Sequence, residues 1–289
     1  MPENPYQRLP LTHRFLVDGG YISWIYGSSY ERMGSWSNGG RLKFRRSRGA
    51  ILLIDSPHSF RQDHSPHYKE RRVTRRIENP EWTEKTALVN EFKADLPADP
   101  SLDIIQIDGC EADDLIAILA GQQMLPFPIS VVGVDKDLLQ LGTYENFRMK
   151  RVTGERMTIG QYASRLPKQA FPFVQTPEAV LLSLILLGDK SDSIPRLIPP
   201  RELHIFQSIM KDSLGNGSVW KKAYRMFGKA FLENLYLTIL PGPFVYRENF
   251  SPQAVYQRLL KGFPTSRLSN QIRPEILEQI IPILNTNHG

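Results

Sequence analysis

Nine acidic residues are spaced along this sequence in a way that suits the binding of divalent metal ions. Glu111, Asp113 and Asp114 fall within four consecutive positions, where negative charges repel one another unless cations are bound. Acids are favoured in the first turn of a helix, and Asp108 with Glu111 would form a capping box, but this accounts for one or two acids only. The full set is Asp18, Asp55, Glu111, Asp113, Asp114, Asp135, Asp137, Asp189 and Asp192.

Two pairs within this set have simpler explanations when each is taken alone. Asp135 and Asp137 are two residues apart, so an extended backbone would direct both side chains to one side. A solvated turn is the alternative, and for this pair alone it is the better interpretation. Asp189 and Asp192 precede a proline, where a loop rich in Asp and Ser is the alternative.

The chemistry that the whole set predicts is metal-dependent phosphoryl transfer. Carboxylate oxygens suit Mg²⁺ and Mn²⁺, and nine of them exceed the needs of one ion. Two ions about 3.5–4 Å apart would bind the attacking and leaving oxygens of an in-line displacement at phosphorus. This chemistry needs no histidine, and we expect His58, His64 and His67 to lie at the surface.

The elements that must position these acids are short apolar runs, which predict strands buried on both faces of a parallel α/β sheet. The runs are residues 15–17, 51–54, 104–107 and 131–134. Three of them lead directly into an aspartate, and the fourth leads into Asp108 and Glu111. Ligands of open α/β sheets bind at the carboxyl ends of the strands, so the acids should gather at one edge. One such aspartate could cap a helix, but coincidence explains three or four poorly.

Helices are predicted from three starting points. One begins near Glu111, a second is an apolar helix at residues 178–187, and the last begins at Pro274, since proline is favoured at a first helical position. Residues 213–218 predict a flexible turn. The change of pattern after Pro177 places a domain boundary near residue 176.

The charge balance predicts a polyanionic partner. The chain has 36 Lys and Arg against 30 Asp and Glu, a net charge of +6 and a pI near 9.3. Without the nine acids above, 21 remain, so the rest of the protein carries an excess of 15 positive charges. A basic surface attracts phosphates, whereas an acidic pocket admits them only with bound cations.

Composition also excludes several classes of protein. The single cysteine, Cys110, excludes an intramolecular disulfide framework and a Cys-ligated zinc site. No apolar run reaches the length of a membrane span, and residues 1–11 are polar and rich in proline rather than signal-like. We therefore expect a cytoplasmic protein without a membrane partner.

Six motifs occur in a fixed order along the chain. They are Leu16-Val17-Asp18-Gly19, Leu53-Ile54-Asp55, Tyr68-Lys69-x-x-Arg72, Glu111-Ala112-Asp113-Asp114, Asp135-Lys136-Asp137-Leu138-Leu139 and Gly188-Asp189-Lys190-Ser191-Asp192-Ser193-Ile194-Pro195. In this order the chain resembles the 5′-nuclease family, which includes bacteriophage 5′–3′ exonucleases, flap endonucleases and the 5′-nuclease domain of bacterial DNA polymerase I. The resemblance covers residues 14–195, about two-thirds of the chain.

The resemblance implies a PIN-like α/β fold: a mostly parallel sheet flanked by helices, a helical arch at about residues 57–100, and a mainly α-helical C-terminal region. It also implies two metal groups. One group would be Asp18, Asp55, Glu111, Asp113 and Asp114, and the other Asp135, Asp137, Asp189 and Asp192. Lys69 and Arg72 match arch residues that contact the scissile phosphate, and Tyr68 matches a residue that can stack on a base. We expect catalytic roles for Lys69, Arg72 and Asp135.

The local sequence agrees with a basic arch. Lys69, Arg72 and Arg76 fall at helical spacing on one face, with a solvated basic helix as the alternative. The residues that we expect to bind DNA are Tyr68, Lys69, Arg71, Arg72, Arg75, Arg76, Arg196 and Arg201.

After Pro195 the sequence departs from the family. The family has a helix–hairpin–helix there, in which a Gly-rich turn and a Lys-Thr pair grip duplex DNA, often with a monovalent ion. Residues 196–203 lack these glycines, so the motif is degenerate and the residues do not support a K⁺ site. Arg196 and Arg201 could supply charge instead. A second candidate face is Lys221, Lys222, Arg225 and Lys229, for which solvation is an equally good explanation.

These observations predict a catalytic domain at residues 1–176 and a helical DNA-binding domain at 177–289. The expected protein is a monomeric, Mg²⁺-dependent 5′–3′ exonuclease or flap endonuclease that cuts DNA at a 5′ end, nick or flap. It would also remove RNA primers from RNA–DNA hybrids, as a stand-alone replication enzyme of the bacteriophage type in the host cytoplasm. The alternatives are a PIN-type ribonuclease, which leaves the motif at 188–195 unexplained, and a non-catalytic DNA-binding module, which an intact set of nine acids opposes.

Overall fold

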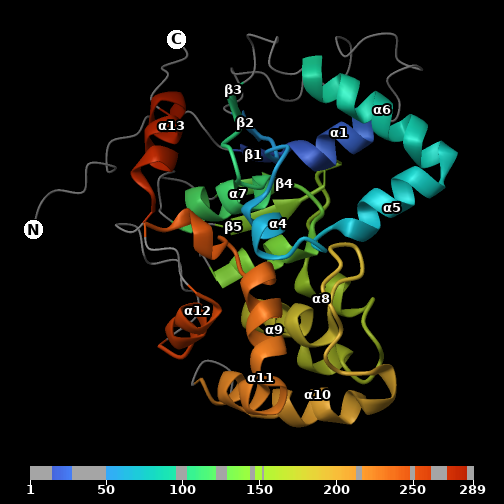
Figure 1. Ribbon diagram of the computed structural model, residues 1–289, viewed down its shortest axis with the longest axis vertical. Coiled ribbons are helices and arrows are strands. Elements are labelled where there is room, and N and C mark those ends of the chain that lie inside the picture. The colour runs from blue at the N-terminus through green and yellow to red at the C-terminus, as the bar shows by residue number, and fades with distance from the viewer. Residues whose placement is uncertain are drawn as a thin grey trace, which may run out of the picture.

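A five-stranded sheet lies at the centre of the protein, and all its strands are parallel (Figure 1). The computed structural model describes residues 15–27, 50–95, 103–121, 129–143, 147–151, 153–212, 217–247, 251–261 and 272–284. The strands are β1 (Phe15–Asp18), β2 (Ala50–Leu53), β3 (Asp103–Ile105), β4 (Ile129–Val132) and β5 (Phe147–Lys150). Every residue of β2 is buried, as expected for a parallel strand with cover on both faces.

The order of the strands in the sheet reverses direction between β1 and β4, which makes this the topological switch point. The order is β3-β2-β1-β4-β5, so the chain builds outward from β1 to β3 and then returns to the other side of β1. Val17 lies beside Val132, and Asp18 lies beside Leu53. The residues that follow β1, β2 and β4 therefore meet at one edge, where open α/β sheets bind their ligands.

The stretch between β2 and β3, in which the sequence predicts an arch, forms three helices. They are α4 (Phe60–His64), α5 (Glu70–Glu78) and α6 (Pro80–Asp95). α4 begins with a capping box made by Ser59 and Gln62. α5 and α6 extend outward in succession, and α6 packs against α1 (Gly19–Gly27) (Figure 1). This outward path is the shape that the predicted arch requires.

The remaining elements of the described residues are helices. They are α7 (Ala112–Gly121), the 3₁₀ helix η4 (Lys136–Thr143), α8 (Ile159–Ala163), η5 (Phe171–Phe173), α9 (Pro177–Leu187), η6 (Pro200–Glu202), α10 (Leu203–Met210), α11 (Ser218–Thr238), η7 (Pro243–Val245), α12 (Pro252–Leu259) and α13 (Pro274–Leu284). α9 packs against both η4 and α11. One apolar core runs from the sheet through α9 into α11, so no break in the core marks residue 176. The division into two domains stays a prediction.

The predicted fold class, a PIN-like α/β fold followed by a helical C-terminal region, is confirmed. The helices expected near residue 111, at 178–187 and from Pro274 are present. The sequence did not predict β5, because this edge strand pairs with β4 alone and its residues alternate between buried and exposed. The turn predicted at 213–218 lies mostly outside the described residues. Among the helices described, none is both long and apolar enough to cross a membrane.

Candidate active site

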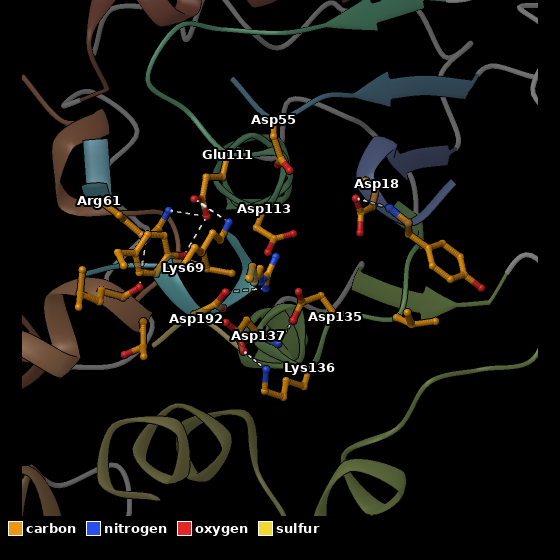
Figure 2. A pocket seen from close by; sticks show the side chains of 18 of the residues that line it. Asp18, Asp55, Arg61, Lys69, Glu111, Asp113, Asp135, Lys136, Asp137 and Asp192 are labelled. Carbon is orange, nitrogen blue, oxygen red and sulfur yellow. Dashed lines mark hydrogen bonds and ion pairs between the residues drawn. The ribbon is translucent and has the colours of Figure 1, made fainter. Parts of the chain in front are cut away.

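A cavity of about 440 Å³ opens at the sheet edge where β1, β2 and β4 end. Seven of the nine predicted carboxylates line it: Asp18, Asp55, Glu111, Asp113, Asp135, Asp137 and Asp192. Figure 2 shows these side chains around a common space, with Asp113 between Asp55 and Asp135. The cations that line the same cavity are Arg61, Lys69, Arg72, Lys93, Lys136 and Arg165. Concentrated negative charge and several positive side chains thus share one cavity.

Backbone amides at helix N-termini orient two of the acids. Asp18 Oδ1 accepts a hydrogen bond from the Tyr21 amide at 3.1 Å, in the first turn of α1. Asp55 Oδ1 accepts one from the Ala112 amide at 2.8 Å, at the start of α7. These bonds use helix amides that have no partner within the helix, and they fix each carboxylate at the positive end of a helix.

The second group of acids depends on a sharp turn after β4. Asp137 lies in the first turn of η4, and its amide donates to Asp135 Oδ1 at 3.0 Å. The backbone therefore turns at this pair, as the alternative interpretation has it, but Asp137 is buried rather than solvated and both residues line the cavity. Asp137, Asp189 and Asp192 place carboxylate oxygens within 4.8 Å of one another. Lys136 Nζ lies 2.5 Å from Asp189 and 3.5 Å from Asp137, so it links two of these acids.

Burial and mutual repulsion raise the pKa values of several of these carboxyls. Burial, followed by the charge of Asp55, raises the pKa of Asp18 to about 7. Burial also raises the pKa of Asp137 to about 8 against the effect of Lys136, and it raises that of Asp113 well above its usual value. Protons and multivalent cations both relieve such repulsion, so the cavity favours either of them over an empty, fully charged state.

Glu111 differs from these acids because cations surround it. Its Oε1 accepts a hydrogen bond from Lys69 Nζ at 2.8 Å, and its Oε2 accepts one from the Tyr68 hydroxyl at 3.1 Å. Burial opposes the charge of Glu111, but Lys69 and Arg61 lower its pKa to about 2. Glu111 is therefore ionised at any pH at which the protein would work.

Asp114 points away from the cavity. Its side chain is fully buried and forms a bidentate pair with Arg61, at 2.6 and 2.8 Å. Asp189 is also absent from the cavity lining, and Lys136 and Ser191 donate hydrogen bonds to its oxygens. The assignment of both residues as metal ligands stays a prediction.

The start of the arch region brings two cations to the carboxylates. Lys69 reaches Glu111, and Arg72 Nη2 lies 2.5 Å from Asp192 Oδ1. Although burial opposes both charges, the neighbouring carboxylates raise the pKa of Lys69 and of Arg72 above their usual values. Both side chains are therefore permanently positive at the wall of the carboxylate cavity.

The backbone at Lys69 departs from the helical spacing that the sequence predicts. Its φ of 61° is left-handed, and α5 begins only at Glu70, so Lys69 does not share a helix face with Arg72. The Lys69 amide instead donates to the Asp192 carbonyl at 2.9 Å. This hydrogen bond holds the backbone just before α5 against the segment that contains Asp192. Left-handed non-glycine residues occur often at functional sites.

Tyr68 lies at the cavity but is only 5% exposed. It packs with Ile194 and Leu237 while its hydroxyl bonds to Glu111. Base stacking by Tyr68 stays a prediction, and it would require the ring to leave this apolar contact.

Four other predicted DNA-binding residues lie outside the cavity lining. Arg71, Arg75, Arg196 and Arg201 are exposed, and Arg75 stacks on Trp82 at 4.2 Å from the ring centroid. The side chain of Arg76 lies outside the described part of the chain. Their roles stay predictions.

The expectation for the histidines is confirmed for two of the three. His58 and His67 are exposed, whereas His64 is only 24% exposed. His64 Nε2 lies 2.6 Å from Glu233, and its ring stacks on Tyr236. His64 therefore connects α4 to α11 rather than facing solvent.

Arg61, Lys93 and Arg165 are cavity residues that the sequence did not indicate. Arg61 is one of several arginines in a basic stretch, and no local pattern marks it as the one that is 1% exposed. Its role depends on partners 50 to 178 residues away in sequence, which local patterns cannot show.

Comparisons with known sequences find relatives of part of the chain. Residues 41–165 match the family model described as "5'-3' exonuclease, N-terminal resolvase-like domain". A 5′-3′ exonuclease of Aquifex aeolicus is 30% identical over 141 residues, which are 47% of this chain and 45% of the relative. The match thus spans less than half the length of that curated relative.

Comparisons with solved structures extend over nearly the whole chain. A bacteriophage T5 flap endonuclease, crystallised as a pseudo-enzyme–product complex with DNA and metal ions, is 17% identical, with 94% of this chain and 99% of that chain covered and a TM-score of 0.58. A T5 5′-exonuclease with bound divalent metal ions (zinc) is 17% identical, with coverage of 92% and 99% and a TM-score of 0.54. At this identity the two structures demonstrate a shared fold.

Proposed function

We propose that this protein is a metal-dependent nuclease that hydrolyses phosphodiester bonds near the 5′ end of DNA, and the match of residues 41–165 to the 5′-3′ exonuclease N-terminal domain supports this proposal. The observation that carries the proposal is the cavity itself. Seven carboxylates line it, and two permanently charged side chains from the arch region, Lys69 and Arg72, lie beside them. That combination is suited to phosphate chemistry and has no evident structural purpose.

The donor set of the cavity fits divalent metal ions. Its acidic ligands offer oxygen alone, which Mg²⁺ and Mn²⁺ prefer over softer ligands. Oδ1 of Asp137 is buried and, within the described part of the chain, accepts no hydrogen bond; the Lys136 ammonium lies 3.5 Å from it, so a metal ion would bind in competition with this ion pair. We propose two Mg²⁺ sites: Asp18, Asp55, Glu111 and Asp113 would hold one ion, and Asp135, Asp137, Asp189 and Asp192 the other. Bound ions would supply an activated water and neutralise the leaving oxygen.

Lys69 and Arg72 would bind the scissile phosphate. The Lys69 ammonium has three N–H donors, of which Glu111 engages one, so it retains donors for a phosphate oxygen. Arg72 has five donors, and its described contacts are with Asp192 and Ser191. Both cations would stabilise the charge that develops on the phosphate as the bond breaks.

The substrate in this proposal is DNA with a 5′ end, a nick or a flap, with RNA–DNA hybrids as a second substrate during primer removal. The T5 flap endonuclease of the same fold was crystallised with DNA and metal ions, which supports this choice. Arg196 and Arg201 are exposed on the C-terminal region and would contact the duplex. We further propose that the protein works as a monomer in DNA replication, in the cytoplasm, as a stand-alone enzyme of the bacteriophage type.

Cleavage of a labelled 5′-flap or nicked duplex in Mg²⁺ tests this function. We expect wild type to release short 5′ products and EDTA to abolish the reaction. Asp135→Asn should lose at least roughly 10²-fold in rate, because it removes a cavity carboxylate. Asp212→Asn is the matched control, since Asp212 lies outside the cavity on the C-terminal region.

Two outcomes would contradict the proposal. Equal cleavage by wild type and Asp135→Asn would show that the carboxylate cavity is not the catalytic site. Cleavage of single-stranded RNA with no activity on the DNA substrates would support a PIN-type ribonuclease instead.

A further inference from the structure

Residues 237–242, at the end of α11 and just beyond it, form a buried strap behind the active site. Leu237, Thr238 and Leu240 line the cavity, although they come from the helical C-terminal region. All six residues of the strap are buried. Two buried polar side chains, Arg61 and Gln140, connect the strap to residues of the two carboxylate groups.

Arg61 connects the strap to Glu111 and Asp114. Its guanidinium is buried and uses all five of its N–H donors. Nε donates to the Leu237 carbonyl at 3.0 Å, and Nη2 donates to the Ile239 carbonyl at 3.2 Å and to Asp114 at 2.8 Å. Nη1 donates to Asp114 at 2.6 Å and to Glu111 at 3.4 Å. No donor remains for a substrate, so Arg61 acts on the site through its neighbours (Figure 2).

Asp114 completes this connection. Besides the two bonds from Arg61, its carboxylate accepts the Gly242 amide at 2.7 Å and the Glu111 amide at 3.3 Å. Four donors from the protein occupy both oxygens of this fully buried side chain. Asp114 thus ties the strap to the backbone of Glu111 and has little capacity left for a metal ion.

Gln140 makes the equivalent connection to the second group. Its side chain is 1% exposed, and its Nε2 donates to the Asp137 carbonyl at 2.9 Å and to the Thr238 carbonyl at 3.0 Å. Its Oε1 accepts the Leu240 amide at 2.9 Å. Gln140 therefore holds the backbone of Asp137 and the strap together, just as Arg61 holds Glu111 and the strap.

We propose that Arg61 and Gln140 are positioning residues that set the separation of the two carboxylate groups through the strap. Two-metal chemistry requires that separation to be held within tenths of an ångström, because both ions must contact one phosphate. The C-terminal region would then be part of the catalytic site as well as a surface for DNA. The inference rests on the two metal sites of the proposed function, and its effect on turnover rests on the proposed nuclease activity as well.

The test uses two conservative variants of the full chain. Arg61→Lys keeps the charge but loses the planar fork, and Gln140→Met keeps the size but loses all three hydrogen bonds. The matched controls are Arg151→Lys and Gln175→Met, whose side chains lie outside the cavity and the strap. Thermal unfolding checks that each variant is folded.

The decisive measurement is the electron paramagnetic resonance spectrum of Mn²⁺ bound to the protein in the absence of DNA. Two Mn²⁺ ions a few ångströms apart give a spin-coupled spectrum that changes with their separation. We expect this coupling to change in Arg61→Lys and in Gln140→Met but not in the controls. With DNA, kcat should fall roughly 10- to 100-fold while KM stays near the wild-type value. The double variant should lose less than the product of the two single losses, because both act through one strap.

Several results would overturn the proposal. One is a folded Gln140→Met protein with wild-type coupling and wild-type kcat; this variant decides the matter if Arg61→Lys fails to fold. Another is a wild-type protein that binds a single Mn²⁺, since no separation would then exist to be set. A wild type that shows the coupled pair but cuts no DNA would refute the proposed function alone, and the spectra of the variants would still decide the role of the strap.

Discussion

Replacing Asp137 with asparagine should make the folded protein more stable at pH 8 in EDTA, although it removes a carboxylate from the active site. Burial and the neighbouring acids raise the pKa of Asp137 from 3.8 to about 8. At pH 8 the wild-type protein must either hold a proton there or accept a charge that its surroundings oppose. Asparagine has nearly the same shape and carries no charge, so it avoids that cost.

The direction of the pH dependence follows from the raised pKa. A carboxyl with a raised pKa in the folded state contributes stability that is complete below its unfolded pKa of 3.8 and is lost as the pH rises through about 8. The asparagine variant has no such loss. The stability of the variant relative to wild type should therefore increase steadily between pH 4 and pH 8.

The size of the effect has an upper limit. A pKa shift of about 4 units, at 1.36 kcal/mol each, corresponds to about 5 kcal/mol. Interacting carboxyls share their protons, so one substitution recovers only part of this amount. We expect the free energy of unfolding of Asp137→Asn to exceed that of wild type by about 1–3 kcal/mol more at pH 8 than at pH 5.

Urea unfolding at pH 5 and pH 8 in EDTA measures this difference, with Asp212→Asn as a control that should show no such trend. Added Mg²⁺ should then stabilise wild type more than Asp137→Asn, because a ligand that binds the folded state stabilises it in proportion to its affinity. If the variant gains nothing over wild type between pH 5 and pH 8, the carboxylates do not repel one another as the structure indicates.

Three further predictions concern single residues. Lys69→Ala should lower the single-turnover cleavage rate by roughly 10²–10³-fold, while the affinity for DNA, measured by fluorescence anisotropy, changes little. If only the affinity falls, Lys69 takes no part in the chemical step. Asp114→Asn should lose about 3–5 kcal/mol of stability by urea unfolding because it leaves Arg61 without its buried partner, whereas Asp113→Asn should lose none. Gly188→Ala should lower stability by about 2–4 kcal/mol, because the φ of Gly188 is 70° and a Cβ would lie 2.7 Å from the backbone oxygen of Ile194 and the backbone nitrogen of Arg196. It should also weaken Mn²⁺ binding measured by calorimetry, and wild-type stability and affinity would contradict this prediction.

The sequence predicted the parallel sheet because its strands are buried on both faces and therefore consist of short, uninterrupted apolar runs. It also predicted that the acids would gather, because parallel strands present their carboxyl ends at one edge. β5 escaped prediction for the opposite reason, since an edge strand with one exposed face lacks such a run.

The detailed geometry of the site depended on contacts between distant residues. The left-handed turn at Lys69 makes the predicted helical spacing of Lys69 and Arg72 wrong. At Asp135 and Asp137 the sequence left an extended strand and a turn open, and the hydrogen bond from the Asp137 amide to Asp135 accompanies the turn. Lys69 lies only 14 positions after Asp55 in the sequence, but the hydrogen bond that holds the Lys69 backbone is accepted by Asp192, which is 123 positions further along the chain.

The sequence by itself determined the inventory of this site: which acids exist, which strand precedes each, and which cations belong to the arch region. Only the tertiary structure decided how each acid is used. Asp113 and Asp114 are adjacent and chemically identical, yet one lines the cavity and the other is fully buried against Arg61. Consecutive residues of a helix point in directions about 100° apart, and what each one meets is set by the strap and α4 folding against that helix.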